Sequence, residues 1–428
     1  MRVGLQAWGS EGDIQPFTAL AAGLVKAGHE VTLVVTDNAG RDYTGLGRRF
    51  GYRVVAVPNP QNQAPGEIDK VWRRIIEAGN PIRQAELIMK YGFDPATEVM
   101  FTAAQQLCGS SDTVVGHFFV FPLRVAAEKA GVPMATVNIV HNCLPSRYIS
   151  PPGLPDLGKW FYPLGWKLVR KVANRILLPR VNALRTREGL KADVDLMSQT
   201  WAAERLNLIA VSPSICHRPP DWEPRHCVCG FFNPPAGLAP DQLPEGLEDF
   251  LQRGTPPVYF TFGSMMPDSL GYIQETATIW VLAIRMLGCR AILQLPWDNL
   301  SLFPSDDRIF KVKRAPYKQV FPGCSAIVHH GGAGTTQSTL LAGRPSLIVA
   351  HMADQFFWGA ELERLGVAGR SLKRQTLSPG GLAKAIGEVL DHPEMAARAS
   401  LIGQQMSKED GVEVAIHLIE EELGRGRN

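Results

Sequence analysis

The chain has 428 residues, of which 45% are hydrophobic and 20% are charged, and its formal net charge is +3. This length is too great for one ordinary domain and suits two domains of about 200 residues each. The small net charge argues against a nucleic-acid partner but is compatible with a weak contact to a membrane surface. No apolar run in the sequence is long enough to cross a bilayer.

The N-terminus leads directly into an apolar segment, without the basic stretch and cleavage site of a secretory signal. We therefore expect no signal peptide and a cytoplasmic protein. The seven cysteines are an odd number at irregular spacing, which is typical of reduced thiols. Their spacing relative to the histidines matches no recognised zinc pattern, so no metal site is expected.

The first half of the chain alternates between short β-branched runs and amphipathic segments. Strands are predicted at residues 2–8, 30–36, 53–57, 113–116, 133–140 and 208–211, and helices at 14–27, 71–90, 95–107, 118–130 and 167–191. This alternation is typical of a doubly wound α/β domain with a parallel sheet. The last of these helices has a basic face.

Residues 141–165 interrupt this pattern with five prolines, three glycines and several aromatic residues, Tyr148 among them. Aromatic, Pro-rich loops at the carboxyl edge of a parallel sheet often line ligand sites, so we interpret this segment as facing a substrate. The alternative is an ordinary surface loop followed by a solvated helix.

Residues 219–244 contain seven prolines and a weak apolar pattern, which indicates a linker. After it, strands are predicted at 257–262, 290–294, 309–312, 325–329 and 346–350, and helices at 247–253, 272–287, 335–342, 358–365 and within 381–423. We therefore predict an N-terminal domain (1–218), a linker (219–246), a second doubly wound domain (247–405) and a C-terminal helix (406–428) that packs back on the first domain.

Three turns rich in glycine follow predicted strands at their carboxyl ends. These turns are Gly9–Gly12, Gly263 and Gly331–Gly334. Ligands of open parallel sheets bind outside the carboxyl ends of the strands. We therefore expect all three turns to face one cleft between the two domains.

The third turn lies in Ile327-Val-His-His-Gly-Gly-Ala-Gly-Thr-Thr336, where a strand leads into three glycines and a helix start. Bare backbone N–H groups and a positive helix end favour binding of a phosphate or diphosphate. The stretch has neither the Gly-Lys-Ser/Thr nor the GxGxxG pattern. Asp354 and Gln355, a carboxylate next to an amide, follow about twenty residues later and suit sugar hydroxyls, so the pair suggests a nucleotide-sugar.

These motifs, together with Phe262-Gly-Ser264 and Gly9-Ser-Glu-Gly-Asp13, resemble glycosyltransferase family 1, a group of GT-B enzymes. The resemblance is closest to microbial sterol, rhamnolipid and antibiotic glycosyltransferases. It implies an inverting, metal-independent hexosyltransferase without a cofactor, whose co-substrate is UDP-glucose or a dTDP-deoxysugar. The implied acceptor is a hydroxyl of an apolar small molecule, such as a sterol, a terpenoid, a polyketide or macrolide, or a lipid.

The resemblance also assigns donor-binding roles in the second domain. The implied set is Ser264, Arg314, Ala315, His329, Gly331, Gly332, Gly334, Thr335, Gln337, Asp354 and Gln355. Arg314 stands where many relatives have a tryptophan that stacks on uracil. This difference leaves open whether the donor carries uridine or thymidine. Gln337 stands where relatives often place a glutamate on the ribose.

Asp13 is the candidate base, because antibiotic glycosyltransferases of this group place an aspartate at this position. The alternative is that Asp13 only caps the following helix, a common role for aspartate. A sharper hypothesis couples Asp13 to His117, and its alternative is that His117 is an ordinary histidine at a strand end. His141 is a third candidate, and Gly12, His141 and Tyr148 are assigned to the acceptor side.

Two other functions fit parts of these motifs. One is a sugar-nucleotide epimerase of GT-B type, which would lack an aromatic acceptor loop. The other is a non-catalytic nucleotide-sugar-binding protein, which would be expected to lose Asp13 or the run from His329 to Thr335.

Overall fold

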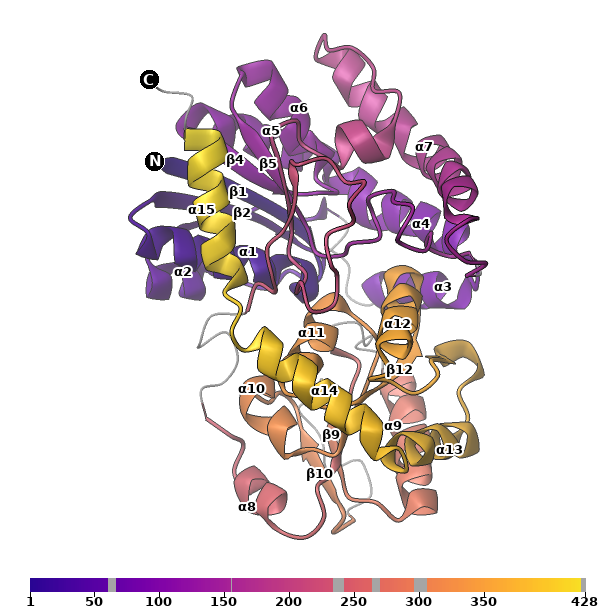
Figure 1. The fold of residues 1–428 in the computed structure, drawn as a ribbon. Helices are drawn as coiled ribbons and strands as arrows, with labels where there is room; N and C mark the ends of the chain where they lie inside the picture. The colour runs from indigo at the N-terminus through magenta and orange to yellow at the C-terminus, as the bar shows by residue number, and fades with distance from the viewer. Residues whose placement is uncertain (61–66, 155, 234–241, 264–269, 296–305, 425–428) are drawn as a thin grey trace. The chain divides into compact units, whose positions relative to one another are not determined.

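The computed structural model describes residues 1–60, 67–154, 156–233, 242–263, 270–295 and 306–424 (Figure 1). The chain forms two compact units. Unit 1 comprises Met1–Pro65, Ala85–Pro235 and Glu409–Asn428, and unit 2 comprises Gly66–Gln84 and Ala236–Lys408. Unit 1 therefore contains both the start and the end of the chain, and the chain enters unit 2 twice.

Unit 1 is built on a seven-stranded parallel sheet with the order β3-β2-β1-β4-β5-β6-β7. Its strands are β1 (Arg2–Gly9), β2 (Glu30–Asp37), β3 (Arg53–Ala56), β4 (Thr113–His117), β5 (Met134–Asn138), β6 (Leu206–Ile209) and β7 (His226–Val228). The strand β7 lies within the predicted linker and pairs with β6, Cys227 opposite Leu208. Its three residues are too few for an alternating pattern to stand out in the sequence.

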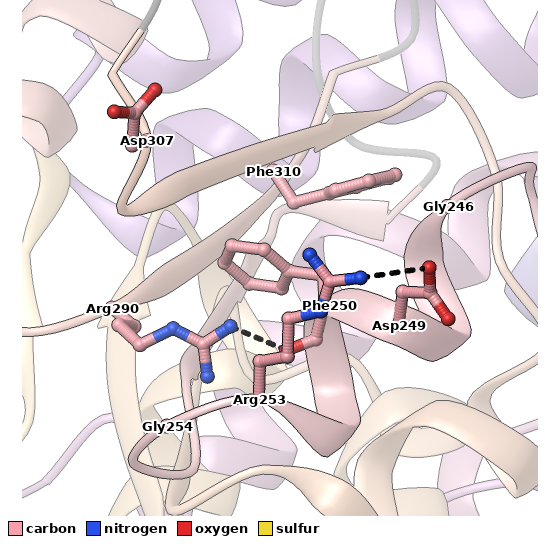
Figure 2. A pocket seen from close by; sticks show the side chains of 8 residues that line it. All are labelled: Gly246, Asp249, Phe250, Arg253, Gly254, Arg290, Asp307 and Phe310. Carbon is pink, nitrogen blue, oxygen red and sulfur yellow. Dashed lines mark hydrogen bonds and ion pairs between the residues drawn. The ribbon is translucent and has the colours of Figure 1, made fainter.

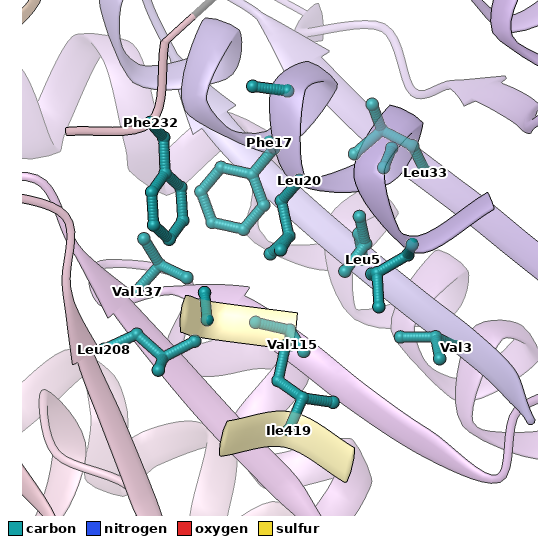
Figure 3. Packing of buried hydrophobic residues seen from close by; sticks show 14 of the residues in the cluster. Val3, Leu5, Phe17, Leu20, Leu33, Val115, Val137, Leu208, Phe232 and Ile419 are labelled. Carbon is teal, nitrogen blue, oxygen red and sulfur yellow. The ribbon is translucent and has the colours of Figure 1, made fainter. Parts of the chain in front are cut away.

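The helices of unit 1 cover both faces of this sheet. They are α1 (Glu11–Lys26), α2 (Thr44–Phe50), α5 (Thr97–Ser110), α6 (Phe121–Ala130), α7 (Tyr162–Arg187) and α15 (Gly411–Gly424), with short π-helical or 3-10 turns at Met89–Phe93, Asp94–Ala96 and Leu196–Thr200. On one face, α1 and α15 pack together, and Figure 3 shows Phe17 and Leu20 of α1 and Ile419 of α15 over strand residues of the sheet. On the other face, α5, α6 and α7 form a second core.

Unit 2 is built on a six-stranded parallel sheet with the order β10-β9-β8-β11-β12-β13. Its strands are β8 (Val258–Thr261), β9 (Ala291–Gln294), β10 (Ile309–Val312), β11 (Ala326–His329), β12 (Ser346–Ala350) and β13 (Leu372–Lys373). The prediction of two doubly wound α/β domains is thus confirmed. The two-residue strand β13 was not predicted, because its length carries no pattern.

The helices of unit 2 are α3 (Glu67–Glu77), α8 (Leu247–Gln252), α9 (Leu270–Leu287), α10 (Tyr317–Val320), α11 (Ala333–Leu341), α12 (Ala353–Leu365), α13 (Pro379–Leu390) and α14 (Pro393–Met406), and α4 (Pro81–Ile88) spans the boundary to unit 1. The single helix predicted over 71–90 is broken between α3 and α4. The break falls at Gly79, which has a φ of 62°, followed by Asn80 and Pro81. Glycine in this left-handed conformation followed by proline ends a helix.

The strand order reverses in both sheets next to a Gly-bearing turn. In unit 1 the reversal lies between β1 and β4, and in unit 2 between β8 and β11. At such a point the connections leave in opposite directions, so the carboxyl ends of the two strands leave room for a ligand. Each unit therefore has one favoured position for a site. Among the described helices, none is both long and apolar enough to cross a membrane.

Candidate active site

In unit 1, Asp13 lies in the first turn of α1, directly after β1. Ser10 precedes the helix, and its backbone N–H and its Oγ donate hydrogen bonds to Asp13 Oδ2 at 2.7 and 2.9 Å. Gly9 allows this close approach, because its φ is 137° and an added Cβ would lie 2.3 Å from Oδ2. Ser10 is thus the N-cap residue, and Asp13 completes its capping box through one carboxylate oxygen.

The other oxygen of Asp13 faces the end of β4. Asp13 Oδ1 lies 3.8 Å from His117 Nε2, and 28% of the Asp13 side chain is exposed. Burial raises the pKa of Asp13 to about 6 despite the opposing Ser10 hydrogen bonds, and burial lowers the pKa of His117 to about 3. Near neutral pH the pair is therefore a carboxylate beside a neutral imidazole, and not an ion pair. The two sequence-predicted candidates for catalysis do lie together.

The ring of His117 lies among aromatic side chains, which explains why it stays neutral. Its centroid is 4.8 Å from that of Phe118 and 6.3 Å from that of Phe119, and neither ring nitrogen has a hydrogen-bond partner within the described structure. Trp201 packs on both phenylalanines at 5.4 and 5.2 Å. Phe119 and Trp201 are only partly buried. Phe118, Phe119 and Trp201 form an aromatic wall beside His117, which the sequence alone does not reveal because Trp201 lies far from Phe119 in the chain.

The acceptor-side residues predicted from the sequence occupy different environments. Gly12 lies in the first turn of α1, next to Asp13. His141 is buried in the loop that follows β5, whereas Tyr148 is half exposed in the same loop. The Lys159 ammonium lies 5.7 Å from the centre of the Tyr148 ring. Gly12 is thus the member of this set that lies directly beside Asp13.

In unit 2, the carboxyl ends of the neighbouring strands β8, β11 and β12 bring the Gly-rich turn together with two other loops. His329, the last residue of β11, is fully buried. Gly331 N–H donates to His329 Nδ1 at 3.2 Å, so the ring proton is on Nε2, which lies 3.2 Å from Ser346 Oγ. One ring nitrogen therefore holds the turn and the other ties it to the start of β12, and burial lowers the pKa of His329 to about 3.

The glycines of this turn differ in what surrounds them. Gly331 has a φ of 91°, and an added Cβ would lie 3.0 Å from the Gln355 carbonyl oxygen. At Gly332 it would lie 2.4 Å from His330 Nε2, whereas at Gly334 it would meet no atom of the described residues within 4 Å. The first two glycines are thus needed by the fold. Gly334 instead leaves space at the N-terminal end of α11, next to Thr335.

His330 was not among the predicted site residues. Its ring is buried against both glycine turns, since an added Cβ at Gly263 would lie 2.9 Å from His330 Cε1. Its Nδ1 has no hydrogen-bond partner among the described residues, and burial lowers its pKa to about 4. In the sequence, the one feature that points to His330 as a site residue is that it directly follows His329.

The Asp354-Gln355 pair lies in the first turn of α12. Gln355 is buried, and its Oε1 accepts hydrogen bonds from the backbone N–H groups of His351 and Met352 at 2.7 and 3.2 Å. The amide oxygen of Gln355 therefore holds the start of the helix. Asp354 is only partly buried.

The remaining donor-side predictions occupy the loop after β10 and the middle of α11. Arg314 is exposed and Ala315 is buried. Tyr317 ties their loop to the strand ends, because its hydroxyl lies 3.1 Å from Gln294 Oε1 and 3.2 Å from Thr261 Oγ1. Gln337 is buried. Ser264 lies outside the described residues.

A pocket of about 470 Å³ in unit 2 lies apart from these residues. Figure 2 shows that it is lined by Phe250, Phe310, Arg253 and Arg290, with the Arg290 guanidinium 4.0 Å from the Phe250 ring. Arg290 directly precedes β9, so the pocket lies at the amino ends of the strands. It is therefore at the opposite edge of the sheet from the glycine turns.

Two family models match the chain. The model of glycosyltransferase family 28 N-terminal domains matches residues 3–140. The model of erythromycin biosynthesis protein CIII-like C-terminal domains matches residues 292–421. The first match includes Asp13 and His117, and the second includes the Gly-rich turn and the Asp354-Gln355 pair.

Curated relatives cover nearly the whole chain. The chain is 30% identical over 445 residues to O-mycaminosyltylonolide 6-deoxyallosyltransferase of Streptomyces fradiae, covering 98% of this chain and 97% of that protein. It is 27% identical over 431 residues to a sterol 3-beta-glucosyltransferase of Arabidopsis thaliana, covering 97% of this chain and 67% of the relative.

Solved structures share the fold at lower identity. The calicheamicin glycosyltransferase CalG4 matches with a TM-score of 0.69 at 17% identity, and the glycosyltransferase VinC, solved in complex with dTDP, matches with a TM-score of 0.67 at 20% identity. Both alignments cover 100% of each chain. Together with the sequence relatives, they show that this protein belongs to the GT-B glycosyltransferases, in the group that contains the antibiotic and sterol enzymes.

Proposed function

We propose that the protein is an inverting glycosyltransferase that moves a hexose from a UDP- or dTDP-sugar to a hydroxyl of an apolar small molecule, with Asp13 as the base. The observation that carries this proposal is that the two carboxylate oxygens of Asp13 have different surroundings. Ser10 holds Oδ2 at 2.7 and 2.9 Å, which leaves Oδ1 for chemistry at the point where the strand order reverses.

The proposed reaction is a single displacement. Asp13 Oδ1 takes the proton of the acceptor hydroxyl while the acceptor oxygen forms a bond to C1 of the sugar. The bond between C1 and the diphosphate oxygen breaks, and the diphosphate leaves with the electron pair. Attack opposite the leaving group inverts C1. A carboxylate with a pKa of about 6 is ionised near neutral pH and still basic enough to accept a proton.

His117 is a poor alternative base, because burial lowers its pKa to about 3. Its ring instead packs beside the carboxylate, with His117 Nε2 3.8 Å from Asp13 Oδ1. We therefore assign His117 a positioning role, in which it keeps water from the carboxylate and so keeps its pKa high.

The leaving diphosphate is assigned to the turn after β11 and the N-terminus of α11. Backbone N–H groups of this first turn have no partner within the helix and carry its positive end. The space at Gly334 lies in this turn, beside Thr335. These groups neutralise the leaving charge without a metal in the proposed mechanism. Asp354 and Gln355 are assigned to hydroxyls of the sugar.

An apolar acceptor is supported by the aromatic wall beside Asp13. Phe119 and Trp201 are partly buried and pack on each other at a tilt, with ring centroids 5.2 Å apart, and the Phe119 ring lies against that of His117. Partly buried aromatic rings next to a single carboxylate bind an apolar body and leave one hydroxyl at the base. The relatives named for a tylonolide derivative and for sterols are consistent with such an acceptor.

The test offers an acceptor library of macrolides, sterols and lipids with UDP-glucose or a dTDP-deoxysugar, and detects products by mass spectrometry. The wild-type chain is expected to add one hexose. Asp13→Asn keeps an oxygen that can accept the Ser10 hydrogen bonds but removes the base, so kcat should fall about 100-fold or more.

Nucleotide binding serves as the control, because the donor residues lie in unit 2. UDP or dTDP should raise the melting temperature of wild type and Asp13→Asn equally, and AMP should not. Loss of nucleotide binding in Asp13→Asn would make Asp13 a structural cap. Failure of both pyrimidine diphosphates to stabilise the wild type would refute the proposed donor.

A further inference from the structure

Unit 1 exposes a cluster of large apolar side chains before and at the start of α7. This apolar tip consists of Leu157, Trp160, Phe161, Leu164 and Leu168, and Trp160 is 96% exposed while each of the others exposes more than half of its surface. They account for five of the thirteen exposed large apolar side chains in the described parts of the chain. Such a concentration of exposed apolar surface indicates a binding surface.

The tip is held in place by the opposite side of the same helix. Phe161, Leu164 and Leu168 follow helical spacing on one side, whereas Tyr162 and Trp166 are buried. Trp166 Nε1 donates a hydrogen bond to the Ile149 carbonyl oxygen at 2.9 Å. Because α7 is anchored in this way, the tip cannot turn its apolar side chains inward, and they stay in solvent when nothing covers them.

Unpaired positive charge adjoins the tip. Lys167, Lys171 and Arg175 are exposed along α7 at a spacing of four residues, and none of them makes an ion pair within the described structure. The helix contains seven Lys or Arg residues and no Asp or Glu. The other cations of α7 are neutralised locally, since Arg170 pairs with Asp195, Arg180 with Asp94, Arg185 with Glu128 and Arg187 with Glu98.

The carboxylate nearest to the tip in sequence is that of Asp156. Asp156 Oδ1 accepts hydrogen bonds from Gly158 N–H and from the Tyr162 hydroxyl, both at 2.9 Å. Asp156 keeps its negative charge, but the exposed Lys159, Lys167 and Lys171 outnumber it, so the net charge beside the apolar tip is positive. Apolar and aromatic side chains next to Lys and Arg on one helix are the pattern of a helix that lies in a membrane interface.

We propose that unit 1 docks reversibly on a membrane surface that contains anionic lipids. The apolar tip enters the boundary between headgroups and acyl chains, and Lys167, Lys171 and Arg175 contact lipid phosphates. Positive charge favours an anionic lipid surface over a neutral apolar partner, because each cation near such a surface adds attraction. This docking is independent of the transfer reaction and does not rest on the proposed function.

The experiment measures co-sedimentation of the full chain with vesicles of phosphatidylcholine, alone or mixed with phosphatidylglycerol. Binding to the mixed vesicles is expected to exceed binding to phosphatidylcholine and to weaken as salt is added. Trp160→Glu should reduce the partition coefficient about tenfold or more, because it places a charge in the interface. Lys167→Glu with Lys171→Glu should reduce it about tenfold or more on the mixed vesicles only.

The control variants are Leu401→Glu and Lys408→Glu, which change an exposed apolar residue and an exposed lysine of unit 2. Both should bind like wild type. The proposal is overturned if the wild type fails to bind mixed vesicles, or if the controls lose as much binding as the tip variants. It is also overturned if the chain is a dimer that Trp160→Glu converts to a monomer, because the tip would then join two copies.

Discussion

At the scale of single residues, Asp13 combines two roles that the sequence presents as alternatives. The helix-capping role uses Oδ2, which Ser10 holds through two hydrogen bonds. The proposed catalytic role uses Oδ1, which faces His117. The capping role therefore does not interfere with the proposed catalytic role. A carboxylate that is held at one oxygen presents its other oxygen in one direction, so the hydrogen bonds to Oδ2 fix the orientation of Oδ1.

The raised pKa of Asp13 predicts how the rate depends on pH. Only the carboxylate accepts a proton, so kcat/KM should rise with pH and reach half its maximum near the pKa of about 6. His117, with a pKa of about 3, is neutral throughout this range and adds no second limb. The measurement is a pH profile of kcat/KM at saturating donor.

His117→Ala tests the cause of this shift. Removing the ring lets water reach Asp13 and lowers the desolvation that raises its pKa, so the midpoint of the profile should move below 6. Phe101→Ala, which removes a buried ring elsewhere in unit 1, is the matched control and should leave the midpoint in place. A midpoint that stays near 6 in His117→Ala would show that His117 does not set the pKa.

At the scale of elements, the turn between β11 and α11 contains glycines that the fold requires and one glycine, Gly334, that it does not require. Gly331 combines a φ of 91° with close contact to Gln355. Gly334 has neither constraint and lies in the first turn of a helix. Alanine is the better helix former by about 0.5–1 kcal/mol, so the fold alone favours alanine at Gly334. We propose that this glycine serves a ligand that approaches the backbone.

Gly334→Ala makes this argument measurable. The melting temperature of the nucleotide-free chain should stay equal or rise, because the added Cβ meets nothing within 4 Å in the part of the chain that the structure describes. The Kd for UDP or dTDP should increase about tenfold or more if the diphosphate occupies that space, as a Cβ would displace it. Calorimetric titration of the wild type and of Gly334→Ala measures the two Kd values.

Gly331→Ala is the contrasting variant. It should lower the melting temperature before any nucleotide is added, because alanine is strained at its φ of 91°. If Gly334→Ala binds nucleotide as tightly as wild type, the open space at Gly334 does not belong to the diphosphate.

At this scale, the sequence predicts those features that depend on residues close together in the chain. The glycine turns, the strands before them and the position of Asp13 depend on neighbouring residues, so their patterns are visible along the chain. The aromatic wall could not be predicted, because Phe119 and Trp201 meet only through folding at 5.2 Å. The same holds for His330, whose burial depends on Gly263, and for β7, whose pairing with β6 is set by the sheet.

At the scale of the whole molecule, unit 1 is completed by the last helix of the chain. In α15, Ala415, Ile416, Ile419 and Leu423 are buried in the same core as the strands of the first sheet. An added Cβ at Gly23 of α1 would lie 2.4 Å from Val412 Cγ1, so the two helices approach closely. The chain therefore passes through all of unit 2 before unit 1 is complete, and unit 1 depends on residues far from its own strands.

This dependence predicts that a single change in α15 destabilises unit 1. Ile419→Ala removes a fully buried side chain beneath the sheet (Figure 3) and should reduce the free energy of unfolding by about 2–4 kcal/mol. Val414→Ala, in the same helix but 43% exposed, should change it by less than about 0.5 kcal/mol. Urea titration gives both values. Below the unfolding transition, Ile419→Ala should bind UDP or dTDP as wild type does, because the proposed donor residues all lie in unit 2. Equal losses in the two variants would mean that the burial of Ile419 is not what α15 contributes, whereas no loss in either would mean that unit 1 is stable without this packing.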